Sequence, residues 1–329
     1  MNIVNQHNFF KVLIRAIVCS IFLFISNAIV AQQDAQYTQY MYNTVSINPG
    51  YAGSRGHVSV AALHRSQWIG LDGAPSTRTI NVHSPIGYRG VGLGLSIVDD
   101  KIGPSSETNF DLDFSYTIWT SKEDRLSFGL KASANLLDVN FSLLNQFREP
   151  NTDPSLPPVP IDQLLQQNID NRFAPNIGAG VYYHTENYYL GLSVPRFLET
   201  THFDESSLSA AKEQVNLYFI GGYVWDINRF TKFKPTILTK AVQGAPLQVD
   251  VSANFMFNEK FIAGAAYRWD AAVSAMVGFQ LEDGLFIGIA YDRETTALGS
   301  TAFNNGSFEV LLRYDFISSK GKLKSPRFF

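Results

Sequence analysis

The chain has 329 residues, of which 45% are hydrophobic, 13% aromatic and only 17% charged. Soluble domains usually carry about a quarter charged residues, whereas low charge with many aromatic residues suits a sheet whose outer face meets lipid. A net charge of −3 gives nucleic acid nothing to bind, and the single cysteine, Cys19, excludes a disulfide or an iron–sulfur site.

The first 31 residues are predicted to form a cleaved signal peptide. Lys11 and Arg15 precede an apolar stretch from Ile17 to Val30, and Ala31 stands directly before a polar run. A basic start, an apolar middle and a small residue at the cleavage point are what signal peptidase requires. The alternative is an N-terminal membrane anchor, for which the apolar stretch is short and interrupted. We therefore expect export, with cleavage near Ala31.

Residues 32–56 are polar, rich in Tyr and Asn, and end in the sequence INPGYAG. They are predicted to form an N-terminal periplasmic arm that precedes the first strand. Gly50 and Gly53, around Pro49 and Tyr51, suit a tight turn that fixes this arm below the first strand. Pro49 and Tyr51 are candidate contacts for a partner protein, and a purely structural turn is the alternative.

Between residues 57 and 316 the sequence alternates apolar and polar residues with the period of a β-strand. Phe110, Leu112 and Phe114, for example, alternate with Asp111 and Asp113. Successive side chains of a strand point to opposite faces, so each run has one apolar and one polar face. Most runs have about ten residues, the length of a tilted strand that crosses a bilayer. The fourteen runs are 57–69, 76–85, 89–99, 105–119, 124–140, 174–184, 187–195, 213–226, 232–242, 246–257, 260–269, 272–282, 284–292 and 305–316.

The connections between these runs alternate in length, which favours a membrane barrel over a sandwich. Starting from a periplasmic N-terminus, every second connection is short, and the others include 70–75, 100–104 and a Pro-rich segment, 141–173, with a helical portion at 161–169. Short periplasmic turns and longer external loops are typical of outer-membrane barrels. The predicted fold is therefore an all-β, transmembrane antiparallel barrel of about 14 strands.

Aromatic residues near the ends of the runs support this fold. An interfacial girdle would lie there, and the alternative is a large soluble β-protein with the same aromatics in its core. The residues concerned are Trp68, Trp119, Trp225, Trp269, Tyr291 and Tyr314.

A barrel of this size encloses more space than its side chains fill, so its lumen holds either a channel or a plug. We expect the arm, 32–56, to plug the lumen partially. Asp111 and Asp113 are predicted to be lumen carboxylates, and Lys131 on the adjacent strand is their predicted partner.

Two further segments hold candidate partner contacts. Trp68, Leu71, Asp72 and Pro75 belong to the first external loop, where Trp68 is either a partner contact or an interface anchor. Residues 317–329 form a basic periplasmic tail. Its residues Arg327, Phe328 and Phe329 are predicted to contact an accessory protein, with an assembly signal as the alternative.

The sequence predicts no catalytic, cofactor-binding or metal-binding residues. The six histidines lack the spacing of a metal site. The glycines of the segment GVGLG, 90–94, fall on one face of a strand and no helix follows, so the structural interpretation is preferred to a phosphate loop. His64 and Ser66 share a strand face, which chance produces often. We expect the protein not to be an enzyme.

Motifs outside the strand pattern are similar to those of a known family. They are QYTQYMYN (36–43), NPGYAG (48–53), RSQWIGLDGAP (65–75), DDKIGP (99–104), LSFGLK (126–131) and SPRFF (325–329). In this order they resemble the PorP/SprF family of type IX secretion system membrane proteins from Bacteroidota. The segment 141–173 and the strands that follow it match only in general pattern.

The resemblance implies a location in the outer membrane and a part in type IX secretion or gliding motility. It implies an accessory component that supports secretion or surface anchoring of a partner adhesin with a C-terminal sorting domain. It also implies contact with the periplasmic ring lipoprotein of the machinery, and no cofactor. The alternative function is an outer-membrane channel or transporter for small or hydrophobic solutes.

Overall fold

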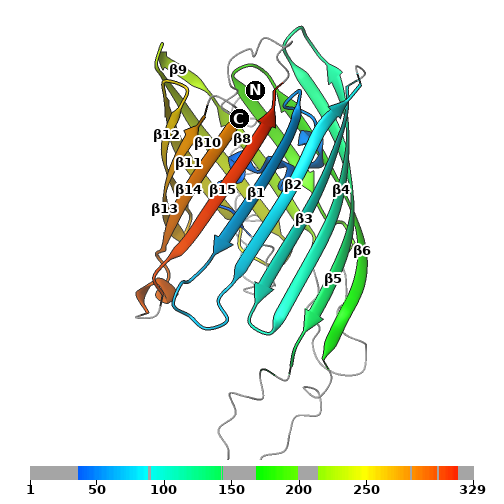
Figure 1. Cartoon of the computed structure of the whole chain (residues 1–329), viewed down its shortest axis with the longest axis vertical. Coiled ribbons are helices and arrows are strands. Elements are labelled where there is room, and N and C mark those ends of the chain that lie inside the picture. Colours follow the sequence, from blue (N-terminus) through cyan, green and yellow to red (C-terminus); the bar gives the residue numbers. More distant parts are fainter. Residues whose placement is uncertain are drawn as a thin grey trace, which may run out of the picture.

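The computed structural model describes residues 36–87, 90–141, 143, 168–198, 214–281, 284–301 and 304–317. Within these ranges the chain is nearly all strand, and its sheet closes into an antiparallel barrel of 14 strands (Figure 1). Among the described residues, no helix is both long and apolar enough to cross a membrane. The predicted signal peptide, most of 141–173 and the tail residues 318–329 lie outside the described residues.

Strands that follow each other in the chain lie side by side, and β1 pairs with β15 to close the barrel. β8 and β9 share one barrel position, since both pair with β10 on the same side. The fourteen predicted runs are thereby confirmed. The strands are β1 Val58–Ser66, β2 Ser76–Ile86, β3 Val91–Ile102, β4 Ser105–Trp119, β5 Arg125–Val139, β6 Ile169–His184, β7 Tyr188–Val194, β8 Asn216–Tyr223, β9 Trp225–Asn228, β10 Thr231–Val242, β11 Gln248–Phe257, β12 Phe261–Arg268, β13 Ala272–Gln280, β14 Leu285–Glu294 and β15 Ser307–Phe316.

β6 and β3 extend furthest beyond their predicted ends. β6 begins at Ile169 and not at 174, because its first residues pair with the end of β5 around a register shift. The predicted helical portion, 161–169, is thus a strand at its last residue, and the rest of it lies outside the described residues. β3 continues to Ile102, opposite Ser105, so Gly103 and Pro104 form a short turn where a loop was expected. In both places, main-chain pairing with the neighbouring strand extends β6 or β3 beyond the residues whose sequence alternates apolar and polar.

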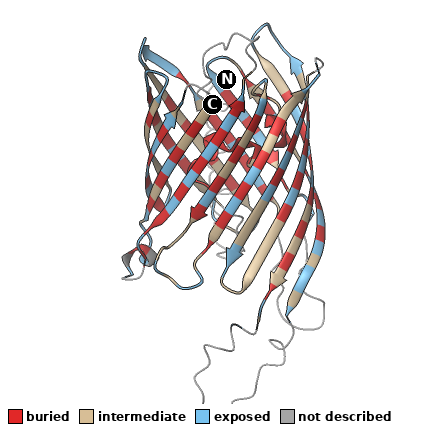
Figure 2. Ribbon diagram, viewed as in Figure 1, coloured by how far each residue is buried: buried red, intermediate tan, exposed pale blue. Residues whose placement is uncertain are grey.

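Burial alternates along the strands in the sense opposite to that of a soluble protein (Figure 2). Large apolar side chains face outward, with Leu130 62% and Ile80 59% exposed, whereas most charged and polar side chains of the strands face inward, together with one apolar cluster. Trp119, Trp225 and Trp269 are also more than half exposed. The alternative of a soluble β-protein with these aromatics in its core is therefore wrong, and the outer face suits hydrocarbon.

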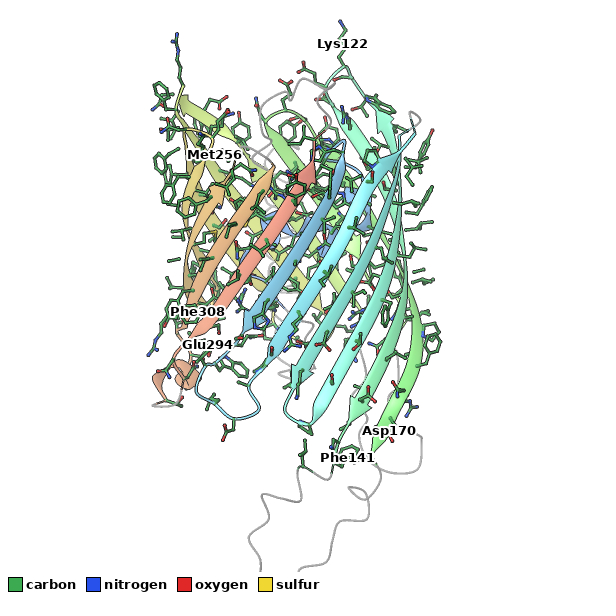
Figure 3. The ribbon with its side chains drawn as sticks, in the orientation of Figure 1. Lys122, Phe141, Asp170, Met256, Glu294 and Phe308 are labelled. Carbon is green, nitrogen blue, oxygen red and sulfur yellow. The ribbon has the colours of Figure 1, made fainter. Side chains whose placement is uncertain are left out.

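The two ends of the barrel differ. Short turns join the strands at the end that carries Lys122, here named the turn end, and β1 begins there. The longer connections lie at the opposite end, near Asp170 and Glu294 (Figure 3), here named the loop end. The predicted alternation of connection lengths is confirmed only in part, because the β3–β4, β10–β11 and β12–β13 connections at the loop end are no longer than the β4–β5 connection at the turn end.

Residues 36–56, here named the plug segment, lie inside the barrel. They form three short helices, η1 Tyr40–Tyr42, α2 Thr44–Ile47 and η2 Pro49–Tyr51, drawn in dark blue within the lumen in Figure 1. The predicted plugging of the lumen by the arm is therefore confirmed for these residues, which lie within the barrel and not below the first strand. Inward polar side chains of the strands provide hydrogen-bond partners that a periplasmic arm would lack.

Candidate functional site

The plug segment runs through the lumen from the loop end to the turn end. At its start, the Gln36 side chain hydrogen-bonds that of Gln248, the first residue of β11 at the loop end. At its end, Arg55 forms an ion pair of 2.9 Å with Asp315, which lies near the turn end of β15. The first described residues of the chain therefore lie at the loop end of the barrel and not at the turn end.

The loop-end anchor consists of three charged side chains and the plug main chain. The Thr38 and Gln39 N–H groups each donate to one oxygen of the Glu309 carboxylate, both at 2.8 Å. The Arg65 guanidinium lies 2.6 Å from Asp292 and 3.2 Å from Glu309. The Thr38 hydroxyl also donates to Asp292, at 2.7 Å. Both buried carboxylates are thus compensated by one cation and by plug donors, as burial of charge requires.

Strand register brings this anchor together. Arg65 on β1 lies directly opposite Glu309 on β15, and both face the lumen because the side chains of a strand alternate. Asp292 comes from β14, on the far side of β15. None of these three residues was predicted from the sequence to hold the plug segment. The sequence feature that could have indicated them is that each is a charged residue at an inward position of a predicted strand.

Tyrosines hold the middle of the plug segment. The hydroxyl oxygens of Tyr37 and Thr79 lie 2.9 Å apart, and those of Tyr40 and Thr236 lie 2.7 Å apart. Burial raises the pKa of Tyr37 and Tyr40 above the ordinary value, although these hydrogen bonds oppose the shift. Both phenols therefore remain neutral and protonated at physiological pH.

The turn NPGYAG packs against glycines of the barrel wall. Asn48 accepts the Gly50 N–H at 2.9 Å and donates to the Val181 carbonyl at 3.0 Å. Gly129 and Gly180 lie opposite each other on β5 and β6. A Cβ at Gly129 would meet the Gly50 nitrogen at 2.1 Å, and one at Gly180 would meet the Asn48 Oδ1 at 2.3 Å. Only glycine at these two positions leaves room for the turn.

Gly92, the middle glycine of the segment GVGLG, leaves room for the plug segment in the same way. A Cβ at Gly92 would lie 2.2 Å from the Ala52 carbonyl oxygen, to which the Ser115 hydroxyl donates at 2.7 Å. The structural interpretation of this segment is therefore confirmed. Pro49 and Tyr51, between these glycine contacts, are buried in the lumen and contact the barrel here.

Asp315 organises the turn-end anchor. Besides Arg55, its carboxylate accepts the Ser59 hydroxyl at 2.7 Å and lies 3.3 Å from both His57 and Arg313. On the opposite wall, Lys131 lies 3.1 Å from Asp111 and 3.4 Å from Asp113, as the sequence predicts.

The plug segment also packs against apolar side chains of the barrel wall. Its residues Tyr40, Met41 and Val45 are at most 2% exposed and belong to one buried cluster with inward side chains of the strands. An open, water-filled lumen would expose those side chains. They include Leu63, Tyr182, Tyr189, Ile220, Met256, Ile262, Met276, Phe286 and Leu311.

The first loop, 67–75, is fixed by main-chain bonds to its neighbours at the loop end. The Ile69 N–H donates to the Gly306 carbonyl at 2.9 Å, and the Asn305 N–H donates to the Ile69 carbonyl at 2.8 Å. On its other side, the Gly103 N–H donates to the Gly73 carbonyl at 2.9 Å. This loop, residues 304–306 and the β3–β4 turn form one platform, here named the loop platform.

The four predicted contacts in this loop differ in accessibility. Asp72 is exposed, Leu71 and Trp68 are half-buried, and Pro75 is buried, so Pro75 does not present a contact surface. Trp68 has a φ of +47° and its indole donates to Glu294. A left-handed backbone is rare for a large side chain and is found where surrounding contacts determine it.

The predicted contacts thus fall into separate places. Pro49 and Tyr51 lie in the lumen, and Trp68, Leu71, Asp72 and Pro75 lie at the loop end. Arg327, Phe328 and Phe329 lie outside the described residues. The structure does not bring these groups together into one site.

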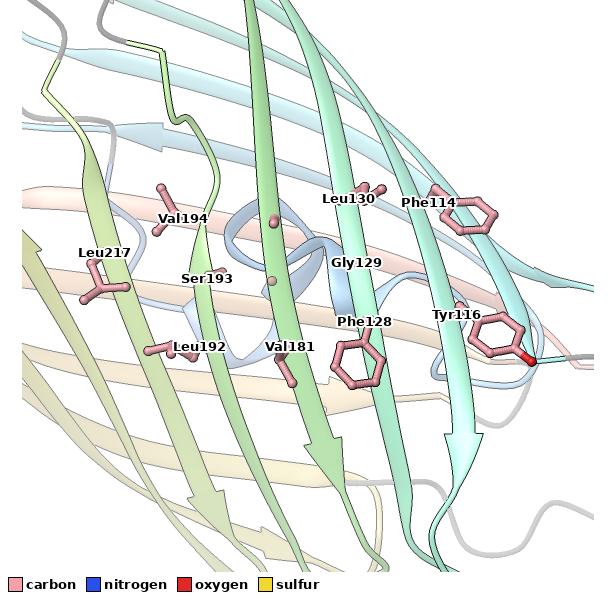
Figure 4. A pocket seen from close by; sticks show the side chains of 12 residues that line it. Phe114, Tyr116, Phe128, Gly129, Leu130, Val181, Leu192, Ser193, Val194 and Leu217 are labelled. Carbon is pink, nitrogen blue, oxygen red and sulfur yellow. The ribbon is translucent and has the colours of Figure 1, made fainter.

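An apolar groove of about 470 Å³ lies on the outer face of the wall, directly outside the plug turn (Figure 4). Phe128, Leu130, Val181 and Leu192 line it, and Gly129 and Gly180 belong to its floor. The plug turn contacts the inner side of the same two glycines. The wall is therefore only one backbone thick here.

Enzyme-like features are sparse. The Ser66 hydroxyl and His64 Nε2 lie 3.1 Å apart, and His64 is exposed on the outer face near the loop end. In the part of the chain that the structure describes, no group of three or more His, Cys, Asp or Glu residues is arranged to hold a metal ion.

The chain is similar to a known protein family over most of its length. A family described as type IX secretion system membrane protein PorP/SprF matches residues 29–314. No curated protein matches the chain significantly. The outer membrane protein Omp33 of Acinetobacter baumannii is 9% identical, with 79% of this chain and 98% of that chain covered and a TM-score of 0.43. A monoaromatic hydrocarbon channel, CymD, is 10% identical, with 88% and 95% covered and a TM-score of 0.47. The NanC porin is 10% identical, with 79% and 100% covered and a TM-score of 0.42.

Proposed function

The chain belongs to the PorP/SprF family of type IX secretion system membrane proteins, and on that premise we propose that it is an accessory component that supports export or surface anchoring of a partner adhesin. The adhesin carries a C-terminal sorting domain and serves gliding motility or a similar process. The turn end faces the periplasm in this proposal, and the loop end faces the cell exterior.

The filled lumen is the observation that supports this proposal over the alternative of a solute channel. The plug segment is covalently part of the chain, hydrogen-bonds at both ends of the lumen and shares an apolar cluster with the strands. Removing it would expose that apolar surface to water, which costs roughly 25 cal/mol per Å². A barrel whose lumen is filled in this way suits binding of partner proteins on its surface better than passage of solutes through its lumen.

Two surfaces are available for partners. The loop platform, with Trp68, Leu71 and Asp72, faces the exterior and is held rigid by main-chain bonds on both sides. In this proposal the adhesin binds to the loop platform. The periplasmic tail, with Arg327, Phe328 and Phe329, is assigned to the ring lipoprotein of the machinery. A rigid platform pays little entropy on binding, which favours a specific contact.

Replacing Trp68 by alanine is expected to weaken adhesin binding while the barrel stays assembled. A central aromatic contact is worth about 2 kcal/mol or more, so co-isolation of the adhesin from detergent-solubilised membranes should fall by at least about tenfold. Trp269→Ala is the matched control, because Trp269 is another tryptophan at the loop end and lies outside the loop platform. Equal co-isolation by both variants, with normal surface adhesin, would remove Trp68 from the contact.

Deleting residues 321–329 is expected to leave a folded barrel but to impair association with the periplasmic ring. The deletion removes Lys322, Lys324 and Arg327, together with both terminal phenylalanines. Heat-dependent electrophoretic mobility reports barrel folding, and co-isolation of the ring lipoprotein reports binding. Normal secretion by this variant would show that the tail is dispensable.

A further inference from the structure

The outer face of β1–β4 is polar at the loop end, although apolar side chains cover most of the outer face of the barrel. Strand pairing places these polar side chains in two neighbouring rows. In one row, His64 lies opposite Arg78, and Arg78 lies opposite Asp99. The group is here named the polar patch, and its eight residues are His64, Ser66, Ser76, Arg78, Asp99, Lys101, Ser106 and Thr108.

The polar patch lies between the apolar band of the wall and the loop platform. Toward the turn end, the next outward residues of β2, β3 and β4 are Ile80, Ile97 and Phe110, which are 59%, 39% and 41% exposed. Toward the loop end, the first loop, 67–75, follows β1 directly and leads into β2 (Figure 1). Cations on a lipid-facing wall are costly at the membrane centre and nearly free of cost at its interfaces. The polar patch therefore lies at the level of the lipid headgroups.

Positive charge and hydroxyl donors dominate the polar patch. The Arg78 side chain is 70% exposed and lies 4.0 Å from Asp99, which is the one acidic residue of the patch and also accepts the Thr108 hydroxyl at 3.4 Å. Lys101 is exposed and forms no ion pair within the described part of the chain. Two exposed cations thus stand against one carboxylate, with serine and threonine hydroxyls on the neighbouring strands.

We propose that the polar patch binds the phosphate-bearing headgroup of an outer-leaflet lipid, whose acyl chains lie along Ile80, Ile97 and Phe110. Guanidinium and ammonium groups bind phosphate through charge-assisted hydrogen bonds, and hydroxyls donate to the remaining oxygens. A ligand that matches both the patch and the adjoining apolar band must join an anionic head to hydrocarbon. A free phosphate or an acidic polypeptide lacks that combination. Only the choice of leaflet rests on the proposed function, which places the loop end outside.

Native mass spectrometry of the purified full-length protein tests this binding. The probe is phosphatidic acid, titrated in detergent against an excess of phosphatidylcholine, whose headgroup has no net charge. Arg78→Gln combined with Lys101→Gln should weaken phosphatidic acid retention by about tenfold, because charge-assisted hydrogen bonds are lost. The matched control, Lys122→Gln with Arg229→Gln, removes two exposed cations at the turn end and should retain the lipid almost as well as the unaltered protein. Equal losses in the two double variants would overturn the proposal.

Removing the acidic residue of the patch should have the opposite effect. Asp99→Asn is expected to strengthen phosphatidic acid retention by about twofold to fivefold, since an exposed charge of this kind contributes modestly. A gain distinguishes an anion site from a structural role, and unchanged or weaker retention would contradict the proposal. Excess inorganic phosphate should not displace the lipid, because it lacks the acyl chains. Full displacement by inorganic phosphate would show that the patch is not a lipid site.

Photocrosslinking in cells identifies the natural occupant. A benzoylphenylalanine probe that replaces Thr108, at the edge of the patch, should form adducts with lipid, and adducts with polypeptide alone would refute the lipid assignment. In vesicles of phosphatidylcholine alone, the patch variants should unfold at the same urea concentration as the unaltered protein, which shows that their folding is intact. Lipid retention by the purified protein is independent of export, whereas surface adhesin on cells that lack the protein reports the proposed function. The two can therefore fail separately.

Discussion

Replacing Gly129 by leucine is expected to unseat the plug segment and open the barrel to ions. A side chain at this position would collide with the Gly50 nitrogen and the Pro49 carbonyl carbon, at 2.1 and 2.4 Å from the new Cβ. Both are main-chain atoms, so no rotamer change relieves the clash. Overpacking of this kind costs about 1–3 kcal/mol or more, which raises the unseated population by roughly ten- to a hundredfold.

Planar-bilayer recording measures this effect directly. The unaltered protein should show little steady conductance, and Gly129→Leu should show frequent large openings. Ala132→Leu is the matched control, because it adds the same kind of bulk on the outer, lipid-facing side of β5. Large steady conductance of the unaltered protein would refute the plug and favour the solute-channel alternative. An equally silent Gly129→Leu variant, correctly folded, would show that this turn does not hold the plug.

Replacing Arg65 by methionine is expected to destabilise the barrel by about 3–5 kcal/mol, because the buried carboxylates of Asp292 and Glu309 lose the guanidinium with which both are paired. Asp292 lies 2.6 Å and Glu309 3.2 Å from the guanidinium, and these three side chains are at most 2% exposed. The variant leaves two buried carboxylates in the lumen with hydrogen bonds from the plug segment and from Ser274 but without the paired guanidinium. Urea unfolding of the protein in lipid vesicles measures the change.

Arg78→Met is the matched control for this prediction. Arg78 is an arginine on the neighbouring strand β2 whose side chain is 70% exposed and lies 4.0 Å from Asp99. An exposed pair of this kind contributes at most about 1 kcal/mol. Adding Asp292→Asn and Glu309→Gln to Arg65→Met should recover part of the loss, since no unpaired charge then remains buried. Equal stability of the Arg65 and Arg78 variants would contradict the assigned role of the network.

The physical basis of the loop-end anchor also explains why its residues escaped prediction. Thr38 and Glu309 are 271 positions apart in the chain, and Arg65 and Glu309 are 244 apart. A strand pattern fixes which side chains point inward, but not which inward side chains meet. The pairing of Lys131 with Asp111 and Asp113 was predictable because those residues lie on adjacent, consecutive strands.

The sequence by itself determined the barrel: the fourteen runs, their alternating faces and the short and long connections. These features are local, since a strand's period of two and a turn's composition are set by residues near one another in the chain. The family motifs added the role in type IX secretion, which no periodicity indicates.

The sequence predicted that residues 36–56 plug the lumen, but how they are held there, and why Gly92, Gly129 and Gly180 must be glycines, depends on the tertiary structure. Closure of β1 against β15 creates an enclosed polar space with unpaired inward groups, and the plug segment satisfies them. The same holds for the extra residues of β6, because they depend on where the neighbouring strand β5 ends. Contacts that exist only after closure leave no local signal in the residues that make them.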